Sequence, residues 1–182
     1  MQNTTELDQF MVKYFPKRRM LFIRNIAEIY LDPTPNNDKG ASLEWENTLH
    51  MLREYMLDHH LPASFAADVC SMIDRESLLR RELCIRNFCI PVDENIEDEN
   101  VSYIPEGSFL TFTPQTLTNA DGALMEGYYI NEMLDEIARS DCEVAGDYYA
   151  EAIAPGIFNN VRHSVTRMQI AVKLAWPAFR RE

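Results

Sequence analysis

The sequence lacks the features that mark an exported or membrane-bound protein. No apolar run approaches the roughly 20 residues that a membrane-spanning helix requires. Residues 1–6 do not form the basic segment followed by an apolar one that begins a signal peptide. We therefore expect a cytoplasmic protein that is not bound to a membrane.

Cysteine and histidine are scarce, and their spacing does not match the common metal-binding motifs. The four cysteines have no CxxC spacing, and no pair of cysteine or histidine residues has the spacing of zinc ligands. In a chain without an export signal, cysteines beside apolar segments are expected to be buried free thiols. We expect neither a metal nor a cofactor. The cysteines are Cys70, Cys84, Cys89 and Cys142.

Basic residues are in the minority. There are 17 lysines and arginines against 29 acidic residues, which gives a net charge of −12. Nucleic-acid binding needs clustered basic side chains, so we expect no direct nucleic-acid binding by this chain. The acidic balance suits attraction of cations, although solubility explains most of it. The acidic segment 93–100 has no glycine or ligand alternation for a calcium loop, so it is interpreted as a linker.

The most informative feature present is an internal repeat. A short pattern near the start recurs 89 residues later, with the same spacing from a proline to an apolar run. Two copies of a unit that cannot close its own core must pack on each other, and the seam between them is a natural ligand site. The identical positions are Val12 and Val101, Tyr14 and Tyr103, Pro16 and Pro105, and Leu21 and Leu110.

The first half of the chain predicts strands around one helix. Residues 10–26 are extended around a turn at Pro16, which cannot donate to a sheet ladder. Trp45, Leu49, Leu52 and Met56 recur at helical spacing, which predicts an amphipathic helix over 43–58. Residues 67–73 and 83–92 are two strand candidates.

The second half repeats this order. Residues 101–113 are predicted to be a strand pair around the turn at 105–107, and 116–122 a loop. A helix follows over 124–139, and strands over 148–153 and 165–174. We predict an α+β fold with two β-α-β-β repeats related by a pseudo-two-fold, in which two main helices pack on an antiparallel sheet and a cleft lies between the halves. The predicted boundaries are an extension at 1–9, a single domain at 10–176 (repeats 10–92 and 101–176, linker 93–100) and a tail at 177–182.

Two segments in the middle of the chain resemble a known family. Residues 89–92 read Cys-Ile-Pro-Val before the acidic linker, and residues 104–109 read Ile-Pro-Glu-Gly-Ser-Phe. They are followed by a helix, by Gly146 and Asp147, and by an acidic residue on a strand that ends at Pro155. This order resembles the gyrase-inhibitor-like (GyrI-like) effector-binding domain, over about residues 10–176.

The resemblance implies a bacterial ligand-sensing domain like the C-terminal multidrug-sensing domains of MerR-type transcription regulators. Such domains bind small, often cationic and aromatic molecules in a cleft between their halves. The DNA-binding region and coiled coil of full regulators are not in the sequence. The chain is therefore expected to be either a domain fused to, or associated with, a DNA-binding domain, or a stand-alone protein. Its oligomeric state is left open.

Glu151 is the first candidate ligand-binding residue. It lies four residues before Pro155, the spacing at which multidrug-sensing relatives place a buried acidic residue that pairs with ligand cations. Small apolar residues surround it in sequence, and a buried carboxylate is costly unless it is paired. Alternation along a strand places Tyr149 and Ile153 on the same face, where an aromatic ring suits a flat cation. An exposed Glu151 and a core Tyr149 are the simpler alternatives.

Four further residues complete the candidate site. Tyr128 and Tyr129 open the second helix, Trp45 opens the first, and Met168 offers adaptable apolar surface. Core packing is the simpler explanation for the aromatic residues.

Two other functions are carried as alternatives. The family includes small-molecule hydrolases, in which case Glu151 would act as a general base. The family name also implies a protein-binding inhibitor, for which the acidic surface could imitate nucleic acid.

Overall fold

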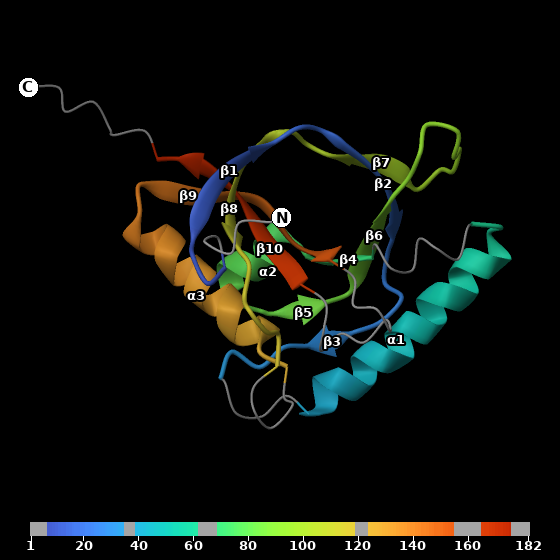
Figure 1. Cartoon of the computed structure of the whole chain (residues 1–182), viewed down its shortest axis with the longest axis horizontal. Helices are drawn as coiled ribbons and strands as arrows, with labels where there is room; N and C mark the ends of the chain where they lie inside the picture. The colour runs from blue at the N-terminus through green and yellow to red at the C-terminus, as the bar shows by residue number, and fades with distance from the viewer. Residues whose placement is uncertain (1–6, 35–38, 62–68, 119–123, 155–164, 176–182) are drawn as a thin grey trace, which may run out of the picture.

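The fold is known from a computed structural model that describes residues 7–34, 39–61, 69–118, 124–154 and 165–175 (Figure 1). The predicted tail, Pro155, most of the N-terminal extension and the starts or ends of several predicted loops lie outside these ranges. The helices are α1 (Lys39–Asp58), α2 (Arg75–Arg80) and α3 (Glu126–Arg139). The strands are β1 (Met11–Phe15), β2 (Arg18–Ile23), β3 (Ile29–Tyr30), β4 (Cys70–Ile73), β5 (Cys84–Ile85), β6 (Asn87–Pro91), β7 (Val101–Ile104), β8 (Gly107–Phe112), β9 (Cys142–Ala154) and β10 (Val165–Leu174).

Eight of the strands form one curled antiparallel sheet, in the order β1-β8-β10-β9-β4-β6-β2-β7. The order is symmetric about the central pair β9 and β4, with the first strand of each repeat exchanged into the other half. The short strands β3 and β5 form a separate pair. The predicted α+β class, with helices on an antiparallel sheet built from two related halves, is confirmed.

The repeated segments pair with each other across this symmetry. The register runs unbroken from Met11 opposite Thr111, through Phe15 opposite Gly107 and Arg18 opposite Ile104, to Leu21 opposite Val101. The prediction that residues 101–113 fold back as a strand pair is therefore wrong. Strands β7 and β8 continue past Pro105 as one bent ribbon, because a proline carries no N–H for a hairpin ladder and favours extended backbone.

This ribbon explains why the sheet is curled. Only Pro16 and Lys17 separate β1 from β2, although these strands lie at opposite ends of the sheet order. Pro105 and Glu106 join β7 to β8 in the same way. The two short connections hold the ends of the sheet close together, and Figure 1 shows β1, β2, β7 and β8 arching over the remaining strands.

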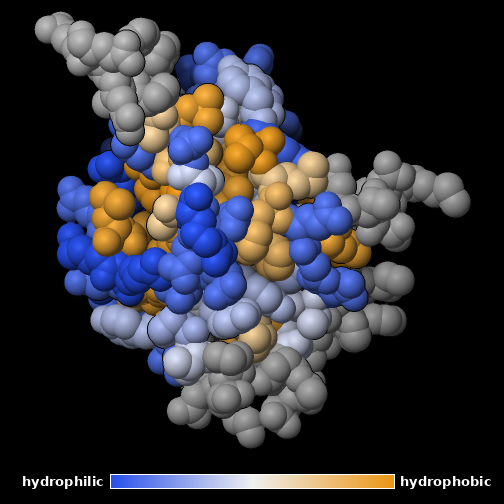
Figure 2. All heavy atoms as spheres, turned by 90° about the vertical axis from the view of Figure 1, so that its left-hand side faces the viewer, coloured by the Kyte–Doolittle hydropathy of each residue, from blue (hydrophilic) through white to orange (hydrophobic). Residues whose placement is uncertain are grey.

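The sheet has two differently packed faces. The outer face carries the main core, in which Tyr148, Phe88 and Ile170 are fully buried beneath the helices. The inner face carries a smaller cluster of buried residues, against which Phe15 and Ala171 also pack. Figure 2 views the side that carries α3 and β9, where hydrophilic and hydrophobic areas alternate. The inner cluster is Met20, Phe22, Cys70, Met72, Cys89, Ile104, Phe109 and Tyr149.

Several element bounds differ from the predictions. Helix α1 begins at Lys39, four residues earlier than expected, and the short helix α2 was not predicted. Helix α2 is made by Asp74, whose side chain accepts from the Ser77 N–H as an N-cap. Strand β9 begins at Cys142 rather than Tyr148. None of the helices that the structure describes has both the length and the apolar character needed to cross a bilayer.

Candidate functional site

Strand β9 sends alternate side chains to the two faces of the sheet. Tyr148 belongs to the outer core, whereas Tyr149 belongs to the inner cluster. Glu151 shares the face of Tyr149, because strand side chains alternate with a period of two. Cross-strand partners on β10 are Gln169 for Tyr149 and Arg167 for Glu151, so these four residues form one polar row on the inner face.

Glu151 is held by side chains of its own chain. Its Oε2 accepts hydrogen bonds from Arg18 Nη1 (3.2 Å), Arg167 Nη2 (2.8 Å) and Gln169 Nε2 (2.8 Å). Arg18 also donates from Nη2 to Gln169 Oε1 at 3.1 Å. The Glu151 side chain is 28% exposed. The expectation of a buried carboxylate without a partner is therefore wrong, since two guanidinium groups already compensate it. We call these four residues the Arg18–Arg167 cluster.

Aromatic rings flank the cluster. The Arg167 guanidinium carbon lies 4.8 Å from the centre of the Phe15 ring, and that of Arg18 lies 5.2 Å from the same centre. Arg18 also lies 5.7 Å from the Phe109 ring, which meets Tyr149 edge-on at 6.4 Å. A continuous line of contacts thus runs along the inner face from Phe15 to Tyr149.

A pocket of about 230 Å³ opens beside Tyr149, where strands β2, β4 and β6 begin or end. Two carboxylates and one guanidinium line it, together with aromatic, thioether and small polar groups. Net charge within the lining is therefore one negative. Its lining residues are Phe22, Arg24, Met72, Asp74, Asn87, Ser102, Tyr103, Pro105, Asp147 and Tyr149.

The pKa values of the two carboxylates in this pocket are shifted in opposite directions. Burial raises the pKa of Asp147, against the lowering effect of the hydrogen bond from the Arg75 N–H (2.9 Å). Burial also acts on Asp74, but hydrogen bonds from Ser77 outweigh it and lower the pKa of that carboxyl. Burial, and then the nearby Asp147 charge, raise the pKa of Tyr149. The charged form of Asp147 would therefore gain from a cation placed nearby, although the Arg24 guanidinium already acts in that direction and lowers its pKa.

Asp147 lies at an irregularity in the sheet. The register between β9 and β10 shifts between Ile170 and Val172, opposite the segment that contains Asp147. Gly146 beside it has room for no larger side chain without movement, because a Cβ there would lie 3.1 Å from the Ala171 Cβ. Irregularities of this kind re-aim side chains next to binding sites.

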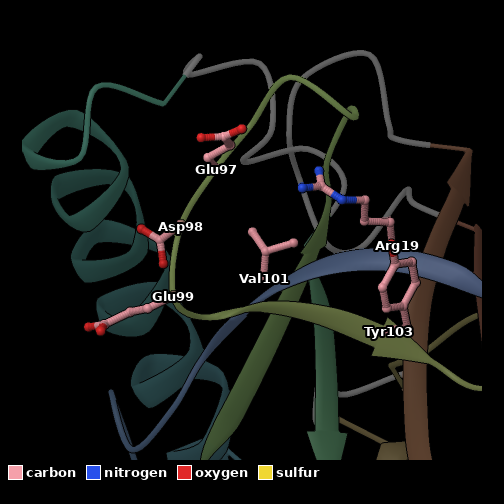
Figure 3. Close-up of a pocket in the computed structure, with 6 residues that line it drawn as sticks. All are labelled: Arg19, Glu97, Asp98, Glu99, Val101 and Tyr103. Carbon is pink, nitrogen blue, oxygen red and sulfur yellow. The ribbon is translucent and has the colours of Figure 1, made fainter.

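A second, more open groove of about 540 Å³ lies along the acidic segment after β6 (Figure 3). Arg19 donates from Nη1 to the Asp93 carbonyl and from Nη2 to the Ile96 carbonyl (2.6 Å), and so fixes the segment through its backbone. The groove is lined by Arg19, Glu97, Asp98, Glu99, Val101 and Tyr103.

The structure does not bring all predicted site residues together. Tyr149 and Glu151 lie on one face of β9, whereas Ile153 lies at a register shift between β9 and β10 and has no partner on β10. Met168 is fully buried in the outer core. Trp45 packs against that core, with its ring centre 5.7 Å from the centre of the Phe88 ring. Their side chains therefore serve the outer core rather than the inner face.

Of the two tyrosines that open α3, Tyr129 packs against the outer core. It donates to the Thr116 carbonyl at 3.3 Å, and its ring lies 5.5 Å from that of Tyr128. Trp45 and Tyr129 pack against the outer core and Met168 is buried within it, so none of the three side chains lines the pocket beside Tyr149.

Sequence reasoning missed the most buried carboxylate of the described residues. Glu126 is 4% exposed, in the first turn of α3. It accepts hydrogen bonds from Tyr148 (2.8 Å) and Ser71 (3.2 Å), and so ties α3 to the two central strands. An acidic residue at a helix start is favoured by the helix dipole wherever it points, so the sequence carried no signal of burial.

The residues of the Arg18–Arg167 cluster did leave a signal. On β10, Arg167 and Gln169 flank Met168 and precede the apolar run Ile170 to Val172.

Among the described residues, no group of three or more histidine, cysteine or acidic side chains is arranged to hold a metal ion.

Solved structures with this fold include two of EcmrR. The crystal structure of the EcmrR C-terminal domain matches with a TM-score of 0.55 and 13% identity, covering 91% of this chain and 98% of that one. EcmrR in a cryo-EM structure of its DNA complex matches with a TM-score of 0.57 and 15% identity, covering 91% of this chain and 57% of that one. The resemblance to the GyrI-like effector-binding domain is thereby confirmed as a statement about the fold.

A third solved structure is less similar and does not bear on the function of this chain. A hydrolase encoded by lin2189 from Listeria innocua covers 93% of this chain at 7% identity and a TM-score of 0.45. No protein-family model and no curated protein sequence matches the chain.

Proposed function

We propose that this chain is a small-molecule effector-binding domain whose ligand occupies the pocket beside Tyr149 on the inner face of the sheet. The observation that carries the proposal is the convergence there of aromatic rings and the half-buried Asp147 carboxylate, on the fold shared with the EcmrR C-terminal domain. The pocket is smaller than the roughly 300–1,000 Å³ typical of drug-sized ligands. It suits one or two fused rings that carry a positive charge.

The positive charge is expected to lie near Asp147. That carboxylate is partly desolvated and adjoins Tyr149 and Phe22, so a flat cation would gain both charge compensation and cation–π attraction. Glu151 extends the same face beyond Tyr149. Because two arginines neutralise Glu151, we place the cation at Asp147 rather than at Glu151.

We further propose that the domain works as the ligand sensor of a MerR-type transcription regulator. The chain spans 57% of the EcmrR chain seen with DNA, and its own net charge of −12 is unfavourable for phosphate contacts. DNA contact would then be supplied by a fused or associated domain.

Binding of a small fluorescent cation, N-methylquinolinium, tests the ligand site by titration and fluorescence. We expect saturable binding that weakens about tenfold in Asp147→Asn and in Tyr149→Ala, and by less than about twofold in Glu151→Gln. Asp141→Asn is the matched control, because Asp141 is an exposed acidic residue just before β9. Equal affinity in Asp147→Asn and the wild type would show that the ligand does not bind in this pocket.

A further inference from the structure

We propose that Arg18 and Arg167 form a subsite for the carboxylate of an aromatic acid, a ligand class opposite in charge to the one that the sequence predicts for Glu151. The Arg18–Arg167 cluster contains two guanidinium groups and one carboxylate, so it keeps one positive charge in excess. Its side chains are largely withdrawn from water, at 19% exposure for Arg18 and 24% for Arg167. A half-buried excess positive charge favours an anion over a cation.

Several N–H donors of the two arginines are not used by Glu151 or Gln169. Each guanidinium carries five N–H donors, and Glu151 and Gln169 together take two from Arg18 and one from Arg167 in the contacts described above. The Nε of Arg18 and the Nε of Arg167 are both buried and have no hydrogen-bond acceptor among the residues that the structure describes. Buried donors without acceptors are rare in folded proteins and are a sign of a missing partner.

The surroundings favour an aromatic acid over a bare ion. The Phe15 ring lies close to both guanidinium groups, and the Phe109 ring lies near Arg18 and contacts the Tyr149 ring. A carboxylate can accept two parallel hydrogen bonds from a guanidinium fork, while its ring lies against Phe15 and Phe109. A free inorganic anion would use the charge but not the rings.

Glu151 then acts as an internal competitor. Its carboxylate occupies the donors that a ligand carboxylate would take, and it holds the two arginines in place when no ligand is bound. Removing its charge should therefore strengthen anion binding, the reverse of what is expected if Glu151 receives a cation.

The test is isothermal titration of the chain with benzoate, with benzamide as the uncharged analogue of the same shape and phosphate as the anion without a ring. We expect benzoate to bind at least about tenfold more tightly than benzamide or phosphate. Glu151→Gln should tighten benzoate binding several-fold, and Arg167→Gln should abolish it. Arg139→Gln is the control, because Arg139 is 64% exposed and pairs with Glu136 on α3.

Each outcome decides the matter. Failure of both the wild type and Glu151→Gln to bind benzoate would overturn the subsite, as would unchanged affinity in folded Arg167→Gln. Phosphate binding as tight as benzoate binding would overturn the assignment to an aromatic acid. If Arg167→Gln does not fold, the change in benzoate affinity in Glu151→Gln still tests the subsite: tighter binding supports it, and weaker binding overturns it. The N-methylquinolinium titration is independent, so loss of benzoate binding with retained cation binding would reject this inference alone.

Discussion

Arg18 donates a 3.2 Å hydrogen bond to Glu151, although 133 residues separate the two in sequence. Arg18 begins β2 in one half of the sheet and Glu151 lies on β9 in the other half, and these strands are not neighbours in the sheet. The contact therefore spans the inner face and fastens the two halves of the curl to each other.

A double-mutant cycle on this pair should show coupling. Arg18→Gln and Glu151→Gln, singly and together, are expected to give a coupling free energy of about 1 kcal/mol in urea unfolding, because both side chains are mostly withdrawn from solvent. Lys173 and Glu143 provide the control, since they form an ion pair between β10 and β9 but are 61% and 57% exposed. Their coupling should stay below about 0.5 kcal/mol. Equal coupling in the two cycles would mean that the Arg18 contact has no special role.

The start of α3 should tolerate no added methyl group. A Cβ on Gly127 would lie 2.4 Å from the Asp32 carbonyl oxygen and 2.9 Å from the Leu31 Cβ. Gly127→Ala is therefore expected to destabilise the fold by about 1–3 kcal/mol through forced movement of the backbone. Gly107→Ala is the control, because a Cβ there meets nothing within 4 Å. Thermal or urea unfolding of both variants checks this, and similar midpoints would contradict the close packing of α3 on residues 31–32.

The fold was predictable because its signals are local and repeated. The helical spacing of Trp45 to Met56 and the β-rich segments around Pro16 and Pro105 define the elements of each half. What the repeat could not show is that Phe15 and Arg18 go to opposite halves of the sheet. A two-residue connection looks the same in sequence whether the chain turns back or continues, and only pairing with the other repeat decides it.

The site was predictable only in part, for a related reason. Alternation along β9 correctly grouped Tyr149 with Glu151, because it depends on neighbours in sequence. The partners of Glu151 come from β2 and β10, which are distant in sequence or separated from it by a loop. The residues next to Glu151 in the sequence therefore do not indicate that its carboxylate is paired. For an aromatic residue on a helix, such as Trp45, the sequence does not distinguish core packing from ligand contact.

Tyr148 should stabilise the protein through its hydroxyl group. It is fully buried and donates a 2.8 Å hydrogen bond to the buried Glu126. Tyr148→Phe leaves that carboxylate with one donor fewer and is expected to cost about 1–3 kcal/mol of unfolding free energy. Tyr14→Phe removes a hydrogen bond to Glu106, but Tyr14 is 65% exposed and its loss should be close to neutral. Chemical denaturation of the pair measures the difference, and equal stability would show that Glu126 does not depend on Tyr148.

The two pocket carboxylates should affect pH-dependent stability with opposite signs. Burial raises the folded-state pKa of Asp147 above its unfolded value, so its unfavourable contribution develops as pH rises from about 4 through the folded pKa. Asp147→Asn should therefore gain stability relative to the wild type at pH 7 and little at pH 3.

Asp74 behaves in the reverse sense. Its folded-state pKa is lowered, so its favourable contribution is present above the unfolded value and is lost as pH falls through the folded pKa. Asp74→Ala also removes the N-cap of α2 and should cost about 1 kcal/mol at pH 7. Urea unfolding from pH 3 to 8 gives both curves, and curves of the same sign would contradict the opposite environments of Asp74 and Asp147.

The cysteines should differ sharply in reactivity towards iodoacetamide. Cys70 and Cys89 face each other on β4 and β6, and Cys84 is buried on β5. The hydrogen bond with Cys70, together with burial, raises the pKa of Cys89, and burial raises that of Cys84. Because the thiolate is the reactive form, these three should be alkylated only as fast as the protein opens, whereas half-buried Cys142 should react first. Mass spectrometry of native and urea-unfolded samples checks the order, and native labelling of Cys89 as rapid as that of Cys142 would show that the inner face is open to solvent.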